Sequence, residues 1–278
     1  MKIRYKFLKN FNSEQVKKLR NYDINVETGF DVFFIDQDDP NLDVIKDILN
    51  IVSNENIIYD TVFSEIDRSK ASYLMVYPSK MLGYPQPEEE DFEFPFDIYP
   101  YLKGVFEIEK TDTLYGLLKG RQINNFNFKK EPNWGSSSIG SGFWIEDFLF
   151  TKPETFEKFF EPLGIKSMPV LEYKTKKELK TVVQLVSQGT ATANLDIKDY
   201  QIDQIQQVES WGIKKYTLLD KGFYPSFIGN PGTLDLFSTK EYFGSGGVTE
   251  NQIIISQKLY QLLKKNNVKG LSYKPMEY

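Results

Sequence analysis

Two stretches of the chain share one order of apolar and polar residues. Between residues 143 and 170, an apolar run ending at Phe150 precedes apolar residues three and four apart, and a new apolar segment begins at Ile165. Residues 252–275 repeat this order after the run Ile253-Ile254-Ile255. A short apolar run indicates a buried strand, and spacings of three and four indicate a helix. Each stretch therefore predicts strand, helix, strand.

Helix boundaries in this chain are marked by small polar residues. Gly164 is expected to end the first helix and either Asn266 or Asn267 the second, because these residues tolerate a positive φ. Hydroxyl residues cap helix starts, and a residue of this kind follows an apolar one before each predicted helix. The pattern occurs at Phe63-Ser64, Phe150-Thr151, Phe237-Ser238 and Ile255-Ser256. We interpret the recurrence as repeated use of a favourable cap rather than as internal duplication.

The first eighty residues predict short elements of both kinds. Alternating apolar residues predict an opening strand over residues 1–8, and Ser13 is suited to cap a helix after it. A buried strand is expected at residues 32–35, followed by a helix whose inner stripe begins at Leu42. Further strands are expected at residues 57–63 and 73–77.

Residues 78–100 differ in composition from the rest of the chain. Five prolines alternate there with acidic and aromatic residues. Because proline removes a backbone donor and blocks helix formation, we expect a long surface loop. We place a domain boundary at its end, between residues 1–103 and residues 104–278. The predicted fold is α+β, with two lobes of mixed or antiparallel sheet and short capped helices, and with strand–helix–strand units repeated in the C-terminal lobe.

The composition excludes several kinds of catalytic site. The 278 residues include no cysteine and no histidine. Disulfides, Cys–His and Ser–His–Asp nucleophilic mechanisms and zinc sites with nitrogen and sulfur ligands are therefore excluded. Carboxylate chemistry remains open, either as an acid/base pair or as an oxygen-ligand site for Mg²⁺ or Ca²⁺.

Charge and hydropathy limit the kinds of partner that the protein can bind. The formal net charge of −5 argues against direct binding of nucleic acid, which requires a basic surface. No apolar run approaches the length of a membrane span, and the N-terminal residues lack the apolar core of a signal peptide. We therefore expect a cytoplasmic location and no membrane partner.

Two further motifs invite a catalytic interpretation. Trp144, Glu146 and Asp147 suggest the paired carboxylates of a glycosidase. Neighbours in a strand point to opposite faces, however, so a polar strand edge is expected there instead. The glycine-rich residues 135–142 and 243–248 lack the Lys-Ser/Thr of a phosphate loop, and we expect ordinary loops.

The candidate partner-binding residues form two acidic clusters. Acidic surfaces steer association with basic proteins, and aromatic residues anchor interfaces. The first cluster lies in the proline-rich segment, and the second lies between a predicted strand and helix near the N-terminus. Their members are Tyr84, Glu88, Glu89, Glu90, Asp91, Phe92, Glu93 and Phe94, and Asp36, Asp38, Asp39 and Asp43.

From residue 64 onward the chain resembles the double-CXXCG-motif proteins, which are grouped with immunity proteins against bacterial polymorphic toxins. The resemblance is carried by short motifs spread over most of residues 60–278, and the first sixty residues show none. The motifs are GYPQP at 83–87, FKKEPNWG at 128–135, FTKPE at 150–154, FEPLGIK at 160–166, TVVQL at 181–185, GIKKY at 212–216 and the segment 253–275.

This chain departs from the family at its defining motifs. Where the family has CXXCG twice, this chain has DTLYG at 112–116 and VESWG at 208–212. The four family cysteines imply a structural zinc site that joins two segments. We expect the same junction here without metal or cofactor, with Tyr115 packed against Trp211 and with Gly116 and Gly212 still serving turns.

The resemblance implies an immunity protein that binds and neutralises a cognate protein toxin in the cytoplasm, with no enzymatic activity. A basic, nuclease-like toxin would suit the acidic clusters. The alternatives are a carboxylate-dependent hydrolase or Mg²⁺-dependent enzyme, and a structural or adaptor module. A deep pocket with convergent acids would favour an enzyme, whereas a shallow surface would favour binding.

Overall fold

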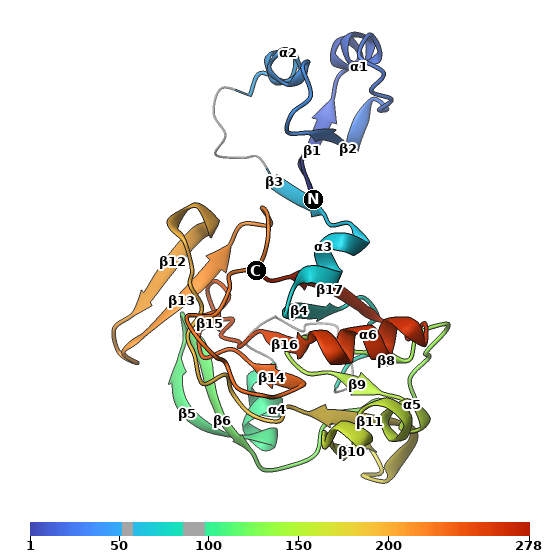
Figure 1. The fold of residues 1–278 in the computed structure, drawn as a ribbon, viewed down its shortest axis with the longest axis vertical. Helices are drawn as coiled ribbons and strands as arrows, with labels where there is room; N and C mark the ends of the chain where they lie inside the picture. The colour runs from blue at the N-terminus through green and yellow to red at the C-terminus, as the bar shows by residue number, and fades with distance from the viewer. Residues whose placement is uncertain (52–57, 86–97) are drawn as a thin grey trace. The chain divides into compact units, whose positions relative to one another are not determined.

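The computed structural model describes residues 1–51, 58–85 and 98–278 (Figure 1). Short helices are interspersed with antiparallel and mixed sheets, which confirms the predicted α+β class. The chain forms two compact units. Unit 1 comprises Met1–Asp67 and Leu218–Phe223, and unit 2 comprises Arg68–Thr217 and Tyr224–Tyr278.

This division falls at residue 67, whereas the sequence placed the boundary at residue 103. The reason is the strand β4 (Tyr73–Pro78), which lies between β16 (Ile253–Ser256) and β17 (Leu271–Pro275) in a sheet of unit 2. Leu74 of β4 is fully buried in the core that these strands share. The segment before the proline-rich stretch is therefore bound to the C-terminal part of the chain by long-range strand pairing.

Unit 1 is built on an antiparallel sheet with the order β2-β1-β3. The strands are β1 (Lys2–Phe11), β2 (Gly29–Asp36) and β3 (Ile58–Val62). The helices α1 (Ser13–Arg20) and α2 (Leu42–Ile48) pack on one face of the sheet, where Leu19 and Ile45 meet inward side chains such as Phe7 and Phe33. The helix α3 (Glu65–Lys70) follows β3.

Unit 2 contains several sheets and the remaining helices. One sheet has the order β7-β10-β11-β9-β8, one has β14-β16-β4-β17 and one has β12-β13-β15, and β5 and β6 form a hairpin. The further strands are β5 (Phe106–Asp112), β6 (Gly116–Gln122), β7 (Asn127–Phe128), β8 (Ile139–Gly140), β9 (Phe150–Thr151), β10 (Lys166–Glu172), β11 (Glu178–Val186), β12 (Ile202–Val208), β13 (Ile213–Leu218), β14 (Leu236–Ser238) and β15 (Tyr242–Phe243). The helices are α4 (Ile98–Val105), α5 (Pro153–Phe159) and α6 (Gln257–Lys265), with short 3₁₀ turns at Glu161–Leu163 and Asp199–Gln201.

Both predicted strand–helix–strand units are present, as β9-α5-β10 and β16-α6-β17. Gly164 (φ +72°) and Asn267 (φ +51°) adopt the left-handed conformation expected after each helix. At the start of α6 the Ser256 hydroxyl accepts a hydrogen bond from the backbone N–H of Leu259 at 3.1 Å. This confirms Ser256 as a helix cap.

Other predicted caps were wrong or displaced. Thr151 belongs to β9, where its buried hydroxyl donates to the Ser138 carbonyl at 2.8 Å, and α5 begins after Lys152. No helix follows Ser238, because its backbone pairs with Ile253 and the chain continues to β15. Ser64 does form a capping box, in which its backbone N–H donates to Asp67 at 2.7 Å.

The segment around residue 144 is also unlike the strand that was expected. Residues 143–148 form turns and bends, and Trp144 has a φ of +66°. Part of the glycine-rich segment that was expected to be a loop is the strand β8, which pairs with β9. None of the helices in the described part of the chain has the length and apolar content needed to cross a membrane.

Candidate functional site

Among the described residues of unit 1, helices pack on one face of the sheet, and we call the other face the open sheet face. Side chains alternate along each strand, so Phe7 and Phe33 point toward α1 and α2 while their neighbours point outward. The outward side chains include large apolar residues that remain exposed, such as Phe30 (73%) and Ile58 (51%). The exposed apolar members of this face are Leu8, Phe30, Val32, Phe34, Ile58 and Val62.

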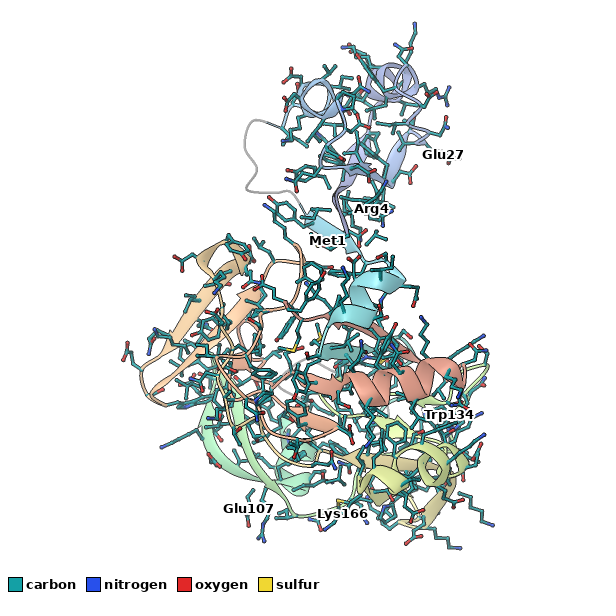
Figure 2. All side chains as sticks on the ribbon, in the orientation of Figure 1. Met1, Arg4, Glu27, Glu107, Trp134 and Lys166 are labelled. Atoms are coloured by element: carbon teal, nitrogen blue, oxygen red, sulfur yellow. The ribbon has the colours of Figure 1, made fainter. Side chains whose placement is uncertain are left out.

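Basic residues of β1 run through the middle of the open sheet face. The guanidinium of Arg4 (Figure 2) lies 4.6 Å from the ring centroid of Phe34, and its Nε donates to Asp60 at 2.9 Å. Lys2 pairs with Asp36 at 3.3 Å. Because these cations have carboxylate partners on the same face, the apolar rings are set among largely balanced charges.

The acidic residues predicted near the N-terminus lie from the end of β2 to the start of α2. Asp36 ends β2 and belongs to the outward row, since it pairs in register with Arg4. Asp38 and Asp43 are exposed in the segment from β2 to α2. Asp39 is half-buried and its carboxylate accepts the backbone N–H of Asn41 at 2.8 Å, so it shapes the turn.

The other predicted cluster belongs to a different unit. Tyr84 lies in unit 2, where its ring stacks on Phe143 at 4.7 Å and lies 4.6 Å from the ring of Trp144. The other members, residues 88–94, lie outside the described residues. The predicted binding residues are therefore divided between the two units.

The net charge of the chain is concentrated in unit 1. Of the chain's 39 acidic and 34 basic side chains, 14 acidic and 9 basic ones belong to unit 1, which gives it a formal charge of −5. The remaining 25 acidic and 25 basic side chains balance each other in unit 2. The acidic character read from the whole sequence is thus a property of the smaller unit.

The segments 112–116 and 208–212 of unit 2 meet at the turns of two hairpins, β5-β6 and β12-β13. The rings of Tyr115 and Trp211 contact each other edge to face, with centroids 6.3 Å apart. Gly116 (φ +90°) and Gly212 (φ +70°) adopt the positive φ that the turns require. The predicted packing of Tyr115 against Trp211 and the predicted turn glycines are confirmed.

A buried lysine next to these rings was not anticipated from the sequence. Lys215 is fully buried, and its ammonium donates to the Gly246 carbonyl at 2.6 Å and lies 5.8 Å from the centre of the Tyr115 ring. Burial lowers the pKa of Lys215 to about 8. The Thr249 hydroxyl also donates to the Tyr115 carbonyl at 2.7 Å. The only available signal was the inward position of Lys215 in the alternation of β13.

A second group of ionisable residues lies near Trp144. Asp147 forms an ion pair with Lys119, and its side chain is only 8% exposed. Burial raises the pKa of Glu250 to about 8. The nearby Asp147 and Glu146 carboxylates also raise this pKa, whereas Lys119 lowers it. Glu146 and Asp147 were expected to point to opposite faces of a strand, and this prediction was wrong because the chain turns there. The described residues contain no cluster of three or more acids suited to hold a metal ion.

Comparison with known proteins identified no relative of this chain. No protein-family model, curated protein or solved structure matches the chain.

Proposed function

We propose that this protein is an immunity protein that binds a cognate protein toxin and neutralises it in the cytoplasm of the bacterium that makes it. The observation that supports this proposal best is the open sheet face of unit 1. A cluster of exposed aromatic and aliphatic side chains on a small domain is typical of a protein-binding surface. Phe30 and Phe34 are the natural anchors, because large aromatic residues dominate interface energies.

The charge of unit 1 favours a basic toxin. A formal charge of −5 on a small unit raises the rate at which a positively charged protein is captured. Asp36 lies on the open sheet face paired with Lys2, and Asp38 and Asp43 are exposed from the end of β2 to the start of α2, so the acidic charge that attracts a basic partner comes from unit 1 as a whole. This agrees with the family resemblance, which implies an inhibitor of a secreted toxin.

The proposal is tested by growth rescue. The candidate toxin is the product of the gene adjacent to the one for this chain, expressed from an inducible promoter with or without this protein. We expect growth to be restored by the natural chain and lost with the double variant Phe30→Asp and Phe34→Asp. These side chains point away from the helices of unit 1, so the variant is expected to fold.

The matched control is Leu114→Asp with Ile228→Asp, which changes two similarly exposed apolar residues of unit 2. Thermal unfolding of both variants checks that they fold. Rescue by the open-face variant equal to rescue by the control would remove the open sheet face from the interface. An adjacent gene product that is harmless, or toxic regardless of this protein, would contradict the immunity function itself.

A further inference from the structure

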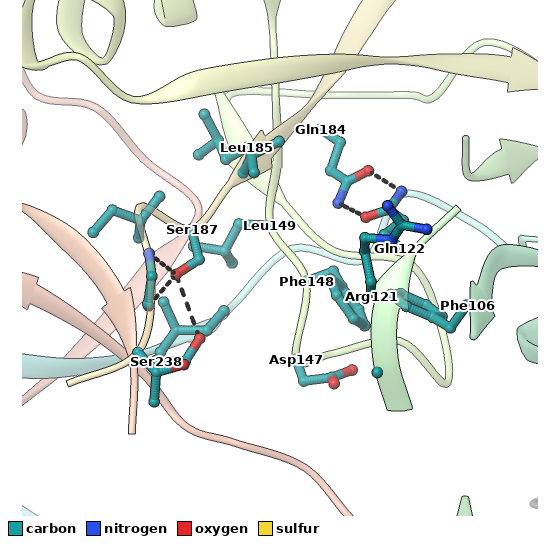
Figure 3. A pocket seen from close by; sticks show the side chains of 16 residues that line it. Phe106, Arg121, Gln122, Asp147, Phe148, Leu149, Gln184, Leu185, Ser187 and Ser238 are labelled. Carbon is teal, nitrogen blue, oxygen red and sulfur yellow. Dashed lines mark hydrogen bonds between the residues drawn. The ribbon is translucent and has the colours of Figure 1, made fainter. Parts of the chain in front are cut away.

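In a cavity of about 540 Å³ in unit 2, the polar side chains largely have partners within the protein (Figure 3). Asp147 is the one acid among the described residues that line it, and it pairs with Lys119. The side-chain amides of Gln122 and Gln184, which Figure 3 shows facing each other, bond at 2.9 and 2.7 Å. The strand β2 of unit 1 differs from this cavity, because backbone groups along its outer edge have no partner among the described residues.

The strand β2 lies at an edge of the unit 1 sheet. The sheet order is β2-β1-β3, and no strand in the described part of the chain pairs with β2 on the side away from β1. Just beyond β2, the Gln37 N–H donates to the Ile3 carbonyl at 2.9 Å, so these two residues form a hydrogen-bonded pair. Bonded and non-bonded pairs alternate between antiparallel strands. The odd-numbered residues of β2 therefore bond to β1, and its even-numbered residues direct their N–H and C=O groups outward.

Two of these outward groups already have partners. The Val32 N–H donates to the side chain of Asp31 at 2.7 Å, and the Asp36 carbonyl accepts the Asp39 N–H at 3.1 Å. The others make no hydrogen bond to any residue that the structure describes. They are the N–H groups of Phe30, Phe34 and Asp36 and the carbonyls of Phe30, Val32 and Phe34. A row of alternating donors and acceptors is what a further strand requires for pairing.

The strand β2 also lacks the features that usually protect the edge of a sheet. Its eight residues include no proline and no lysine, and its register with β1 runs through all eight pairs without a bulge. The other edge strand, β3, is partly covered within unit 1. There the Thr61 hydroxyl donates to the Asp220 carbonyl at 2.9 Å and accepts the Gly222 N–H at 2.9 Å. The edge of β2 is therefore the one at which a further strand can pair.

The charge of unit 1 determines which kind of strand is attracted to this edge. A second copy of the protein would bring another formal charge of −5, which opposes the pairing of two β2 strands, whereas a basic segment is attracted. Successive side chains of an added strand point to opposite faces of the sheet. On the open sheet face they would lie beside Phe30 and Phe34, and on the other face beside Asp31. Apolar residues that alternate with lysine or arginine suit both faces.

We propose that the toxin adds an extended segment of alternating apolar and basic residues to β2, as a fourth strand of the unit 1 sheet. Its backbone bonds to the even-numbered residues of β2, and its apolar side chains lie next to Phe30 and Phe34. This inference rests on the proposed function and specifies how the toxin uses the open sheet face. In this mode of recognition the backbone bonds supply affinity and the alternate side chains supply specificity.

Amide hydrogen exchange of the full chain, followed by NMR with and without the toxin identified by growth rescue, tests the pairing. In the free protein the N–H groups of Phe30, Phe34 and Asp36 should exchange fast, because they face the outer edge of the sheet. In the complex we expect their exchange to slow by about tenfold or more, because they then donate to the added strand.

The outcomes of this experiment separate the inference from the function on which it rests. A toxin that covers the open sheet face without pairing would leave the three amides exchanging as in the free protein. That result would overturn the strand addition and leave the immunity function intact. Absence of growth rescue by the natural chain would instead contradict the immunity function, and the strand addition would be rejected with it.

The variant Val32→Pro provides a second test. Because the Val32 N–H points outward, proline at this position keeps the bonds to β1 and an apolar side chain, while its ring obstructs an added strand. The matched control Val32→Ile keeps the N–H. We expect the Kd for the toxin to rise by about tenfold or more in Val32→Pro and by less than about twofold in Val32→Ile. Equal affinities of the two variants would overturn the proposal.

Thermal unfolding checks that both variants fold, and if Val32→Pro does not, the exchange measurement on the natural chain decides. Size-exclusion chromatography of the protein alone tests the other occupant of the edge. We expect the natural chain and Val32→Pro to elute at the same volume. A dimer of the natural chain that Val32→Pro converts to a monomer would assign the edge of β2 to a second copy and overturn the proposal.

Discussion

Gly116 lies where the turn of one hairpin approaches the backbone of another segment. A Cβ atom at this position would lie 2.0 Å from the Gly247 carbonyl oxygen, and the φ of +90° is itself unfavourable for other residues. Gly212 has a similar φ of +70°, but a Cβ there would meet no atom within 4 Å. Substitutions at Gly116 and Gly212 thus separate the effect of a positive φ from the effect of close packing.

We expect Gly212→Ala to lower the free energy of unfolding by about 1–2 kcal/mol, the usual effect of a left-handed conformation on a residue with a Cβ. Gly116→Ala should lower it further, by roughly another 1–3 kcal/mol, because the backbone of residue 247 must move. Urea unfolding of both variants measures the difference. Equal losses would show that the loop at residue 247 adjusts without resistance.

The buried Lys215 should make the stability of the protein rise with pH in the alkaline range. Its pKa is lowered from 10.5 to about 8 in the folded protein, because burial disfavours the charged form. Between pH 8 and 10.5 the unfolded chain therefore binds more protons at this residue than the folded protein does, and stability from this group rises with pH. Lys215→Met should remove that rise. Unfolding free energies of both proteins at intervals from pH 7.5 to 10.5 test this, and parallel curves would contradict it.

The buried Glu250 should have the opposite effect at lower pH, where stability should fall as the pH rises. Its pKa is raised from 4.5 to about 8, so between these values the folded protein binds more protons than the unfolded chain. Stability from this group is highest below pH 4.5 and falls as the pH rises toward 8. Glu250→Gln should flatten the fall between pH 5 and 8, whereas the exposed Glu178→Gln should leave it unchanged. An unaltered slope in Glu250→Gln would mean that the carboxyl is already ionised at neutral pH.

At the scale of elements, the start of α1 provides a matched test of capping. The sequence suggested Ser13 as the cap, but the Asn12 side chain accepts the Gln15 backbone N–H at 2.9 Å, and the Gln15 side chain accepts the Asn12 backbone N–H at 3.2 Å. Asn12→Ala should therefore lower the stability of unit 1 by about 1 kcal/mol, and Ser13→Ala should change it by only a few tenths. Chemical unfolding monitored by an amide signal of unit 1 measures both. A larger loss for Ser13→Ala would restore the original prediction.

Local signals in the sequence identified many elements of the fold. The alternation of β1 and the Ser256 cap depend on residues that are neighbours in the chain, so the sequence predicts them directly. Thr151 and Ser238 have the same local pattern as Ser256, yet neither caps a helix. Strand partners far away in sequence determine their conformations, and a single sequence does not reveal those partners.

In the candidate sites too, features that depend on distant parts of the chain were not predicted from the sequence. The contact between Tyr115 and Trp211 was predicted because the two motifs were compared with a family in which they meet. The burial of Lys215 and the positive φ of Trp144 depend on contacts between distant segments, and they were not predicted. The open sheet face was missed for a related reason, since residues 32–35 were expected to form a buried strand, whereas Val32 and Phe34 are exposed.

At the scale of the whole molecule, charge and chemistry are separated between the two units. Unit 1 carries the formal charge of −5 and the open sheet face, and unit 2 is balanced overall and holds the buried ionisable groups. Long-range attraction of a basic protein depends on net charge and weakens with salt, whereas apolar contacts depend little on salt. Unit 1 should therefore control the rate of association with a basic toxin.

This leads to a test with the toxin identified by growth rescue. The association rate constant, measured by stopped flow, should fall steeply as NaCl is raised from 20 to about 300 mM, because the Debye length shortens to below 10 Å. Asp38→Lys with Asp43→Lys, which changes exposed acids of unit 1, should lower the rate at low salt and flatten the salt dependence. Glu157→Lys with Glu161→Lys makes the same change of net charge on unit 2 and should have a smaller effect. Equal effects of the two pairs would show that the toxin responds to the charge of the whole chain and not to that of unit 1.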